Sequence, residues 1–263
     1  MERIRRLVRK VLGYNNPIYR FSARLADDLA VISSEGVGTW RALRRLGSSN
    51  NCLKVQTIKL QRLQYPIAIR AGTKDVLSII SNCVREEYGQ FQRDFDPQFI
   101  IDAGAYIGDT SAYFLTRFPR CCVVALEPND DSRVQAEKNL ACYQPRVELI
   151  GAALFDSVGS VTFGGTETGA SIGGGDIEVP TTTVPALLAR YDKERIDILK
   201  MDIEGAETTV LRSGDNDWLK SVRLLLLGTY GPRIEAEVLP LLARNGFEFQ
   251  RFRNLWYCRN LNT

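Results

Sequence analysis

The sequence predicts an α/β fold in which helices cover both faces of a mostly parallel, seven-stranded sheet, the doubly wound arrangement. Between residues 99 and 245, short apolar runs alternate with segments of helical periodicity, as in parallel strands joined by helices. The last apolar runs, 247–252 and 255–258, follow each other closely and predict an antiparallel hairpin at one edge. We therefore divide the chain into an N-terminal helical and β-hairpin extension, residues 1–95, and a sheet domain, residues 96–263.

The parallel strands are expected at short runs rich in Ile, Val and Leu, because strands buried on both faces have this composition. These runs are 99–101, 122–126, 147–150, 196–201 and 224–227. The segments with helical periodicity are 110–117, 132–143, 184–191, 206–212 and 234–245. Gly246 ends the last helix. The glycine-rich stretch 164–175 predicts a surface loop, which either closes over a site or is a plain connector.

The extension begins with a polar segment of helical character, residues 1–50. Alternating apolar and polar residues at 55–63 and 65–70 predict a β-hairpin after it. Thr73 or Asp75 is placed to cap a short helix that follows.

The first ten residues are basic, and the N-terminal segment is amphipathic, with Ile4, Leu7, Val8 and Leu12 at helical spacing. This segment is either a helix packed on its own domain or a peripheral contact with an anionic membrane, such as the inner membrane face.

The composition excludes several classes of site. The 263 residues include no histidine, which excludes Ser-His-Asp and Cys-His catalysis and any metal site that needs imidazole. The six cysteines form no C-x-x-C pair, so we expect no metal and interpret them as free thiols of a cytoplasmic protein. The net charge of +3 argues against a nucleic-acid partner, and no stretch is long enough to span a membrane.

Three predicted strands end in a carboxylate: Asp102, Glu127 and Asp202. Ligands of doubly wound sheets bind beyond the carboxyl ends of the strands, at the point where the strand order reverses. We therefore expect these three side chains to border one ligand site.

The loop after Asp102 has glycines at positions 104 and 108 and then opens a helix. A dinucleotide fingerprint requires G-x-G-x-x-G, but its third position here is Tyr106, which would crowd a pyrophosphate. Glu127, at the end of the next strand, can accept hydrogen bonds from two ribose hydroxyls. The pattern thus favours a ribose-containing ligand without a pyrophosphate.

Beyond the fourth strand, Lys200 and Asp202 project to the same face, and Glu204 and Gly205 turn into a helix. Asp202 can therefore face both the reactive group of the bound ligand and the molecule that accepts it. The alternatives are an ion pair between Lys200 and a carboxylate, or an N-cap at Asp202.

These residues resemble the FkbM-type methyltransferases, a branch of the class I, Rossmann-like fold that uses S-adenosylmethionine. The resemblance covers residues 55–252 and is most specific in the D-I-L-K-M-D-I-E-G-A-E run. The matching stretches are 102–111, 127–129, 139–140, 152–154, 179–188 and 197–207, preceded by 69–75 and 87–88.

The resemblance implies O-methylation of a hydroxyl on a sugar, glycan, glycolipid or secondary metabolite, with the extension packed over the acceptor site. The expected catalytic residues are Asp202, Glu204, Lys200 and Tyr230. The expected S-adenosylmethionine-binding residues are Thr73, Tyr88, Asp102, Ala103, Gly104, Ala105, Tyr106, Gly108, Asp109, Thr110, Ser111, Glu127, Pro128, Asn129, Ala153 and Asp202.

The sequence departs from the family after the fifth strand, where Glu-x-His is usual and Gly228-Thr229-Tyr230 stands here. The base that takes the acceptor proton is then Asp202, Glu204 or Tyr230, of which we favour Asp202. The alternatives are an inactive S-adenosylmethionine-binding module and an NAD(P)-dependent oxidoreductase. The sequence leaves the oligomeric state open.

Overall fold

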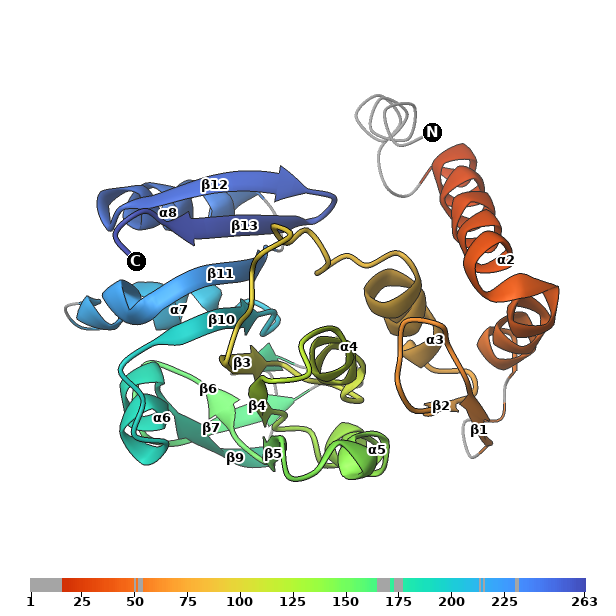
Figure 1. Cartoon of the computed structure of the whole chain (residues 1–263), viewed down its shortest axis with the longest axis horizontal. Coiled ribbons are helices and arrows are strands. Elements are labelled where there is room, and N and C mark those ends of the chain that lie inside the picture. Colours follow the sequence, from red (N-terminus) through yellow and green to blue (C-terminus); the bar gives the residue numbers. More distant parts are fainter. Residues whose placement is uncertain are drawn as a thin grey trace. The chain divides into compact units, whose positions relative to one another are not determined.

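The computed structural model of the chain describes residues 16–49, 51, 54–164, 171–172, 177–212, 214, 216–229 and 232–263. The chain forms two compact units, Met1–Glu86 and Glu87–Thr263, which Figure 1 shows in colours that follow the sequence. Residues 87–95, which we assigned to the extension, belong to the second unit. That the extension covers an acceptor site stays a prediction.

The first unit contains a long helix, a hairpin and a short helix, as the sequence predicts. The helix α2 follows Asn16, whose side chain caps it by accepting a hydrogen bond from the Ile18 amide at 2.9 Å. At Gly36 the backbone leaves the helical region (φ 84°, ψ 169°), and Figure 1 shows the resulting bend. The elements are α2 (Pro17–Gly47), β1 (Val55–Ile58), β2 (Ile67–Arg70), α3 (Asp75–Ile79) and a π-helical turn (Ile80–Val84).

Asp75 fastens α3 to the hairpin. Its buried carboxylate accepts a hydrogen bond from the Arg70 amide at 2.8 Å and pairs with the Arg70 guanidinium at 2.9 Å. Asp75 therefore lies inside the helix and is not its cap. The Thr73 hydroxyl accepts from the Asp75 amide at 3.2 Å and donates to the Arg70 carbonyl at 3.0 Å, so it serves the turn before the helix.

The second unit is built on a seven-stranded sheet in the order β12-β13-β11-β10-β3-β4-β5 (Figure 1). All neighbours are parallel except β13, which is antiparallel to both β11 and β12. The predicted class I, doubly wound fold with an antiparallel hairpin is confirmed. The strands are β3 (Phe99–Ala103), β4 (Cys122–Leu126), β5 (Val147–Ile150), β10 (Ile196–Met201), β11 (Val222–Gly228), β12 (Phe247–Phe252) and β13 (Leu255–Asn260).

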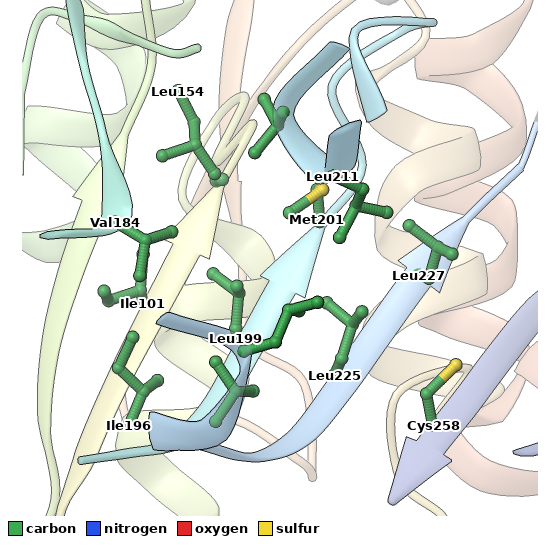
Figure 2. Packing of buried hydrophobic residues seen from close by; sticks show 14 of the residues in the cluster. Ile101, Leu154, Val184, Ile196, Leu199, Met201, Leu211, Leu225, Leu227 and Cys258 are labelled. Atoms are coloured by element: carbon green, nitrogen blue, oxygen red, sulfur yellow. The ribbon is translucent and has the colours of Figure 1, made fainter. Parts of the chain in front are cut away.

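Helices pack on both faces of this sheet, with α4 and α5 on one face (Figure 1). On the other face, Ile101, Leu199 and Leu225 project from the central strands and meet Val184 of α6 and Leu211 of α7 (Figure 2). Burying large aliphatic side chains of this kind stabilises a fold by about 1.5–3 kcal/mol each. The helices are α4 (Asp109–Arg117), α5 (Asp130–Leu140), α6 (Val184–Arg190), α7 (Glu207–Arg212) and α8 (Pro232–Arg244), with short 3₁₀ turns at Ala141–Tyr143 and Asp217–Ser221.

A second, four-stranded sheet was not predicted. Its strands are β6 (Ala153–Leu154), β7 (Gly159–Gly164), β8 (Ser171–Ile172) and β9 (Ile177–Thr182), in the order β6-β9-β7-β8. Its small core joins Ala153, Val179 and Val161. The predicted loop 164–175 lies largely outside the described residues; of the described ones, Gly164 ends β7 and Ser171 and Ile172 form β8.

Five of the six cysteines are described, and all five are free thiols: Cys83, Cys121 and Cys258 are buried, whereas Cys122 and Cys142 are exposed. Among the helices that the structure describes, none combines the length and apolar character needed to cross a bilayer.

Candidate functional site

The three strand-end carboxylates lie on neighbouring strands. In the sheet, β3 stands between β10 and β4, so that Asp102 pairs in register with Lys200 on one side and Ala125 on the other. Glu127 follows β4 directly and Asp202 follows β10 directly. The structure therefore brings together the carboxylates that the sequence placed at one edge.

Asp102 is fully buried and is held by two groups. The Ser111 hydroxyl, from the first turn of α4, donates to Asp102 Oδ2 at 2.6 Å, and Lys200 Nζ lies 3.0 Å from Oδ1. Lys200 Nζ also donates to the carbonyls of Ala103, at 3.1 Å, and Gly104. Burial alone would lower the pKa of Lys200, but the nearby charges of Asp102 and Asp202 raise it above its ordinary value.

The ion pair that we left open for Lys200 is therefore present. Its ammonium spans the end of β3 and the start of the glycine loop, where it fixes backbone carbonyls. This geometry lets Lys200 position the loop, and the catalytic role that we expected of it stays a prediction.

The glycine loop presses against the segment after β10. Gly104 has φ 77°, and a Cβ atom there would lie 2.0 Å from the Asp202 carbonyl oxygen, so only glycine fits. The Asp202 amide donates to the Ala103 carbonyl at 3.3 Å, and the amides of Gly104 and Ala105 donate to the Leu126 carbonyl. The loops after β3, β4 and β10 are thereby tied into one surface.

Glu127 is anchored by two amides from different loops. The Tyr106 amide donates to Glu127 Oε2 at 2.7 Å, and the Asn129 amide donates to Oε1 at 2.8 Å. Burial raises the pKa of Glu127 to about 7, although these two hydrogen bonds and the charge of Lys200 lower it. Each oxygen accepts one hydrogen bond from the protein here and, with two lone pairs, can accept another.

The start of α4 is fixed by α5. Gly108 has φ 78°, and a Cβ atom there would come within 2.9 Å of Leu140 Cγ. The Asn139 side chain donates to the Ile107 carbonyl at 2.8 Å. The expected site residues Asp109, Thr110 and Ser111 form the first, buried turn of α4. The loop and helix start thus form a rigid edge beside Glu127.

Asp202 contacts two residues that are distant in sequence. The Tyr88 hydroxyl donates to Asp202 Oδ2 at 3.0 Å, and a Cβ atom on Gly228 would lie 2.6 Å from Oδ1. Burial and the charge of Asp202 raise the pKa of Tyr88, which keeps this phenol protonated and able to donate. Tyr257 holds the Tyr88 segment, since its hydroxyl donates to the Glu87 carbonyl at 2.6 Å.

The first residue of α7, just after the turn that follows β10, is a buried carboxylate that the sequence analysis missed. Glu207 Oε1 accepts from the Ile203 amide at 3.0 Å, beneath Glu204 (φ 54°) and Gly205 (φ 101°). Burial raises the pKa of Glu207 to about 7. The only available signal was its place at the end of the most specific motif, since its spacing also suits a solvent-facing helical residue.

The other expected residues have separate positions. Asn129 caps α5, because its Oδ1 accepts from the Ser132 amide at 2.9 Å, and Pro128 precedes it. Ala153 is buried in β6, Thr73 belongs to the first unit, and Tyr230 lies outside the described residues. Within the described part of the chain, no group of three or more acidic or cysteine side chains is arranged to hold a metal ion.

The family described as "Methyltransferase FkbM domain" matches residues 102–256, which include every strand-end carboxylate of this site. The chain belongs to this family. Residues 102–256 are therefore a domain of the S-adenosylmethionine-dependent methyltransferase type, which argues against the oxidoreductase alternative.

Two relatives resemble this FkbM-family chain in sequence. The AMB antimetabolite synthetase AmbE of Pseudomonas aeruginosa is 30% identical over 57% of this chain, but the match spans only 9% of AmbE. The methyltransferase sdnD of Sordaria araneosa is 28% identical over 60% of this chain and 76% of its own length. Among solved structures, the FkbM methyltransferase of Methylobacillus flagellatus KT is 16% identical with a TM-score of 0.48, covering 69% of this chain and 52% of that one.

Proposed function

We propose that this FkbM-family chain transfers the methyl group of S-adenosylmethionine to a hydroxyl oxygen of a sugar, glycan, glycolipid or related secondary metabolite. The observation that carries the proposal is the convergence of Asp102, Glu127 and Asp202 on the ends of three adjacent strands, joined by a tight glycine loop. The acceptor class rests on the family resemblance, and the placement of Asp202 supports a proton-accepting role for it.

The residues present fit S-adenosylmethionine. Glu127 is fixed by the amides of Tyr106 and Asn129, and its remaining lone pairs suit the two hydroxyls of a ribose. The close approach of the backbone at Gly104 suits a flat loop against which the methionine end would lie. Asp102 and Lys200 would keep that loop in place.

Methyl transfer to oxygen requires alignment more than activation. S-adenosylmethionine, held by Glu127 and the loop at Gly104, would supply an electrophilic methyl group for the acceptor oxygen, and its sulfur would keep the electron pair of the broken carbon–sulfur bond. Asp202 accepts the proton that the acceptor hydroxyl loses. Tyr88 orients Asp202 by its hydrogen bond, and Glu204 is the next candidate for the base. Holding the reactants in line accounts for about 7–11 kcal/mol in favourable intramolecular models.

Binding is tested by isothermal titration of the whole chain with S-adenosylmethionine, S-adenosylhomocysteine and NADPH. We expect the first two to bind and Glu127→Ala to weaken their affinity by at least about tenfold, since hydrogen bonds to a charged group contribute ~1.5–3 kcal/mol. Glu137→Ala, which removes an exposed glutamate on α5, is the matched control and leaves affinity unchanged. Binding of NADPH alone would overturn the proposal.

Turnover is tested with S-adenosylmethionine carrying a labelled methyl group and a panel of hydroxylated glycans and metabolites. We expect Asp202→Asn to lower kcat by about 100-fold or more, the usual contribution of a general base, while the affinity for S-adenosylhomocysteine stays the same. An unchanged kcat would remove Asp202 from this role. Label transfer to no acceptor of the panel would favour the inactive binding module.

A further inference from the structure

The N-terminal half of α2 exposes an apolar stripe. Ile18 and Phe21 are 63% and 70% exposed, and Leu25 and Leu29 are also exposed. Their spacing places all four side chains on one face of the helix, over about three turns. Single exposed apolar residues are common on protein surfaces, but an aligned row marks a surface that contacts something apolar.

This stripe does not face the core of its own unit. The side chains of α2 that point inward belong to other positions: Val31 is buried, and Asp27 pairs with Arg85. Asp28 likewise accepts from the Trp40 indole at 2.8 Å and pairs with Arg44. The acidic residues of this half of the helix are thus neutralised inside the unit, whereas its apolar row faces outward.

The charge around the stripe is strongly positive. Residues 1–26 contain six arginines and one lysine against one glutamate, a net charge of +6, although the whole chain carries only +3. Two of these arginines, Arg20 and Arg24, are exposed on α2 itself. A basic segment joined to an exposed apolar row combines the two attractions that hold a helix at an anionic lipid surface.

We propose that the N-terminal half of α2 binds the surface of an anionic lipid bilayer. The helix lies in the plane of the interface, with Phe21 and Leu25 inserted among the acyl chains and Arg24, at the flank of the stripe, near the phosphates. Arg20 lies farther round the helix and adds its charge to the attraction at longer range. A symmetric contact between two copies would bring two segments of net charge +6 together, which opposes dimerisation through this face. A nucleic acid would use the arginines but not the apolar row.

The test is co-sedimentation of the full chain with vesicles of phosphatidylcholine alone and of phosphatidylcholine mixed with phosphatidylglycerol. We expect binding to the mixed vesicles, weakened by added salt. Phe21→Ser with Leu25→Ser should lower the partition coefficient by about tenfold or more, since burying either side chain contributes more than 1 kcal/mol. Leu77→Ser is the matched control, because Leu77 is 61% exposed in the same unit but lies on α3.

A second variant, Arg20→Gln with Arg24→Gln, leaves the apolar row intact and should weaken binding to the mixed vesicles alone. Circular dichroism checks that each variant is folded. Equal binding to both vesicle types, no binding to either, or unchanged binding by both double variants would overturn the proposal. So would light scattering that finds a dimer for the natural chain and a monomer for the Phe21 and Leu25 variant, which would assign the stripe to a second copy.

Discussion

Gly228 is a glycine because of Asp202 and not because of its own backbone. It ends β11 in an extended conformation that any residue adopts, yet a Cβ atom would lie 2.6 Å from Asp202 Oδ1 and 2.9 Å from Cγ. The Asp202 carboxylate therefore occupies the space in which a side chain at position 228 would begin. A residue with a side chain at position 228 would therefore require the Asp202 carboxylate to move.

Gly228→Ala should move the Asp202 carboxylate away from Tyr88 without disturbing the Glu127 side of the site. We expect kcat to fall on the order of 100-fold, as a misplacement of about 1 Å does, while the affinity for S-adenosylhomocysteine stays within about twofold. Gly159→Ala is the matched control, because a Cβ atom there meets nothing within 4 Å. A Gly228→Ala enzyme with the natural kcat would show that the position of Asp202 is not critical.

At the scale of elements, the strand ends could be predicted because a parallel strand has two recognisable features, its composition and the position of its carboxyl end. Each strand is a short apolar run, and the residues at its carboxyl end all lie at the same edge of the sheet. Asp102 is the last but one residue of β3, whereas Glu127 and Asp202 directly follow their strands. Asp102, Glu127 and Asp202 follow from this rule alone. The C-terminal hairpin was equally predictable, since two apolar runs flank a two-residue turn at Arg253 and Asn254.

The contacts between elements could not be predicted. Tyr88 and Asp202 are 114 residues apart, and no local pattern pairs a tyrosine before β3 with a carboxylate after β10. Likewise, β6 and β8 have only two residues each, too few to show alternation. In the sequence, Glu207 occupies a position that suits an exposed residue of a helix. Its burial follows from the turn after β10, whose Ile203 amide donates a hydrogen bond to it.

At the scale of the whole molecule, the absence of histidine means that other side chains must account for any titration near neutral pH. Histidine normally titrates between pH 5 and pH 8, and none is present. Burial raises the pKa of Glu127 and of Glu207 from 4.5 to about 7 in each case. The buried Tyr88 and Lys200 have raised pKa values that lie above this range, so they keep their charge state throughout it.

These two glutamates lead us to expect a loss of stability as the pH rises toward neutral. Between pH 4.5 and about 7, the folded state keeps protons that the unfolded state has released, so the free energy of unfolding falls as the pH rises. Above about pH 7 both states are ionised and the loss is complete. Each glutamate accounts for a decrease of up to about 3 kcal/mol in the free energy of unfolding, because one pKa unit corresponds to ~1.4 kcal/mol.

We therefore expect the ligand-free chain to be less stable at pH 8 than at pH 5, measured by urea unfolding at both pH values. Glu127→Gln with Glu207→Gln removes both titrating carboxyls, so the difference between the two pH values should shrink. Glu137→Gln, at an exposed position of α5, should leave the difference as it is. A natural chain that is equally stable at both pH values would mean that Glu127 and Glu207 titrate normally, and Glu127 would then meet the ribose as an ordinary solvated carboxylate.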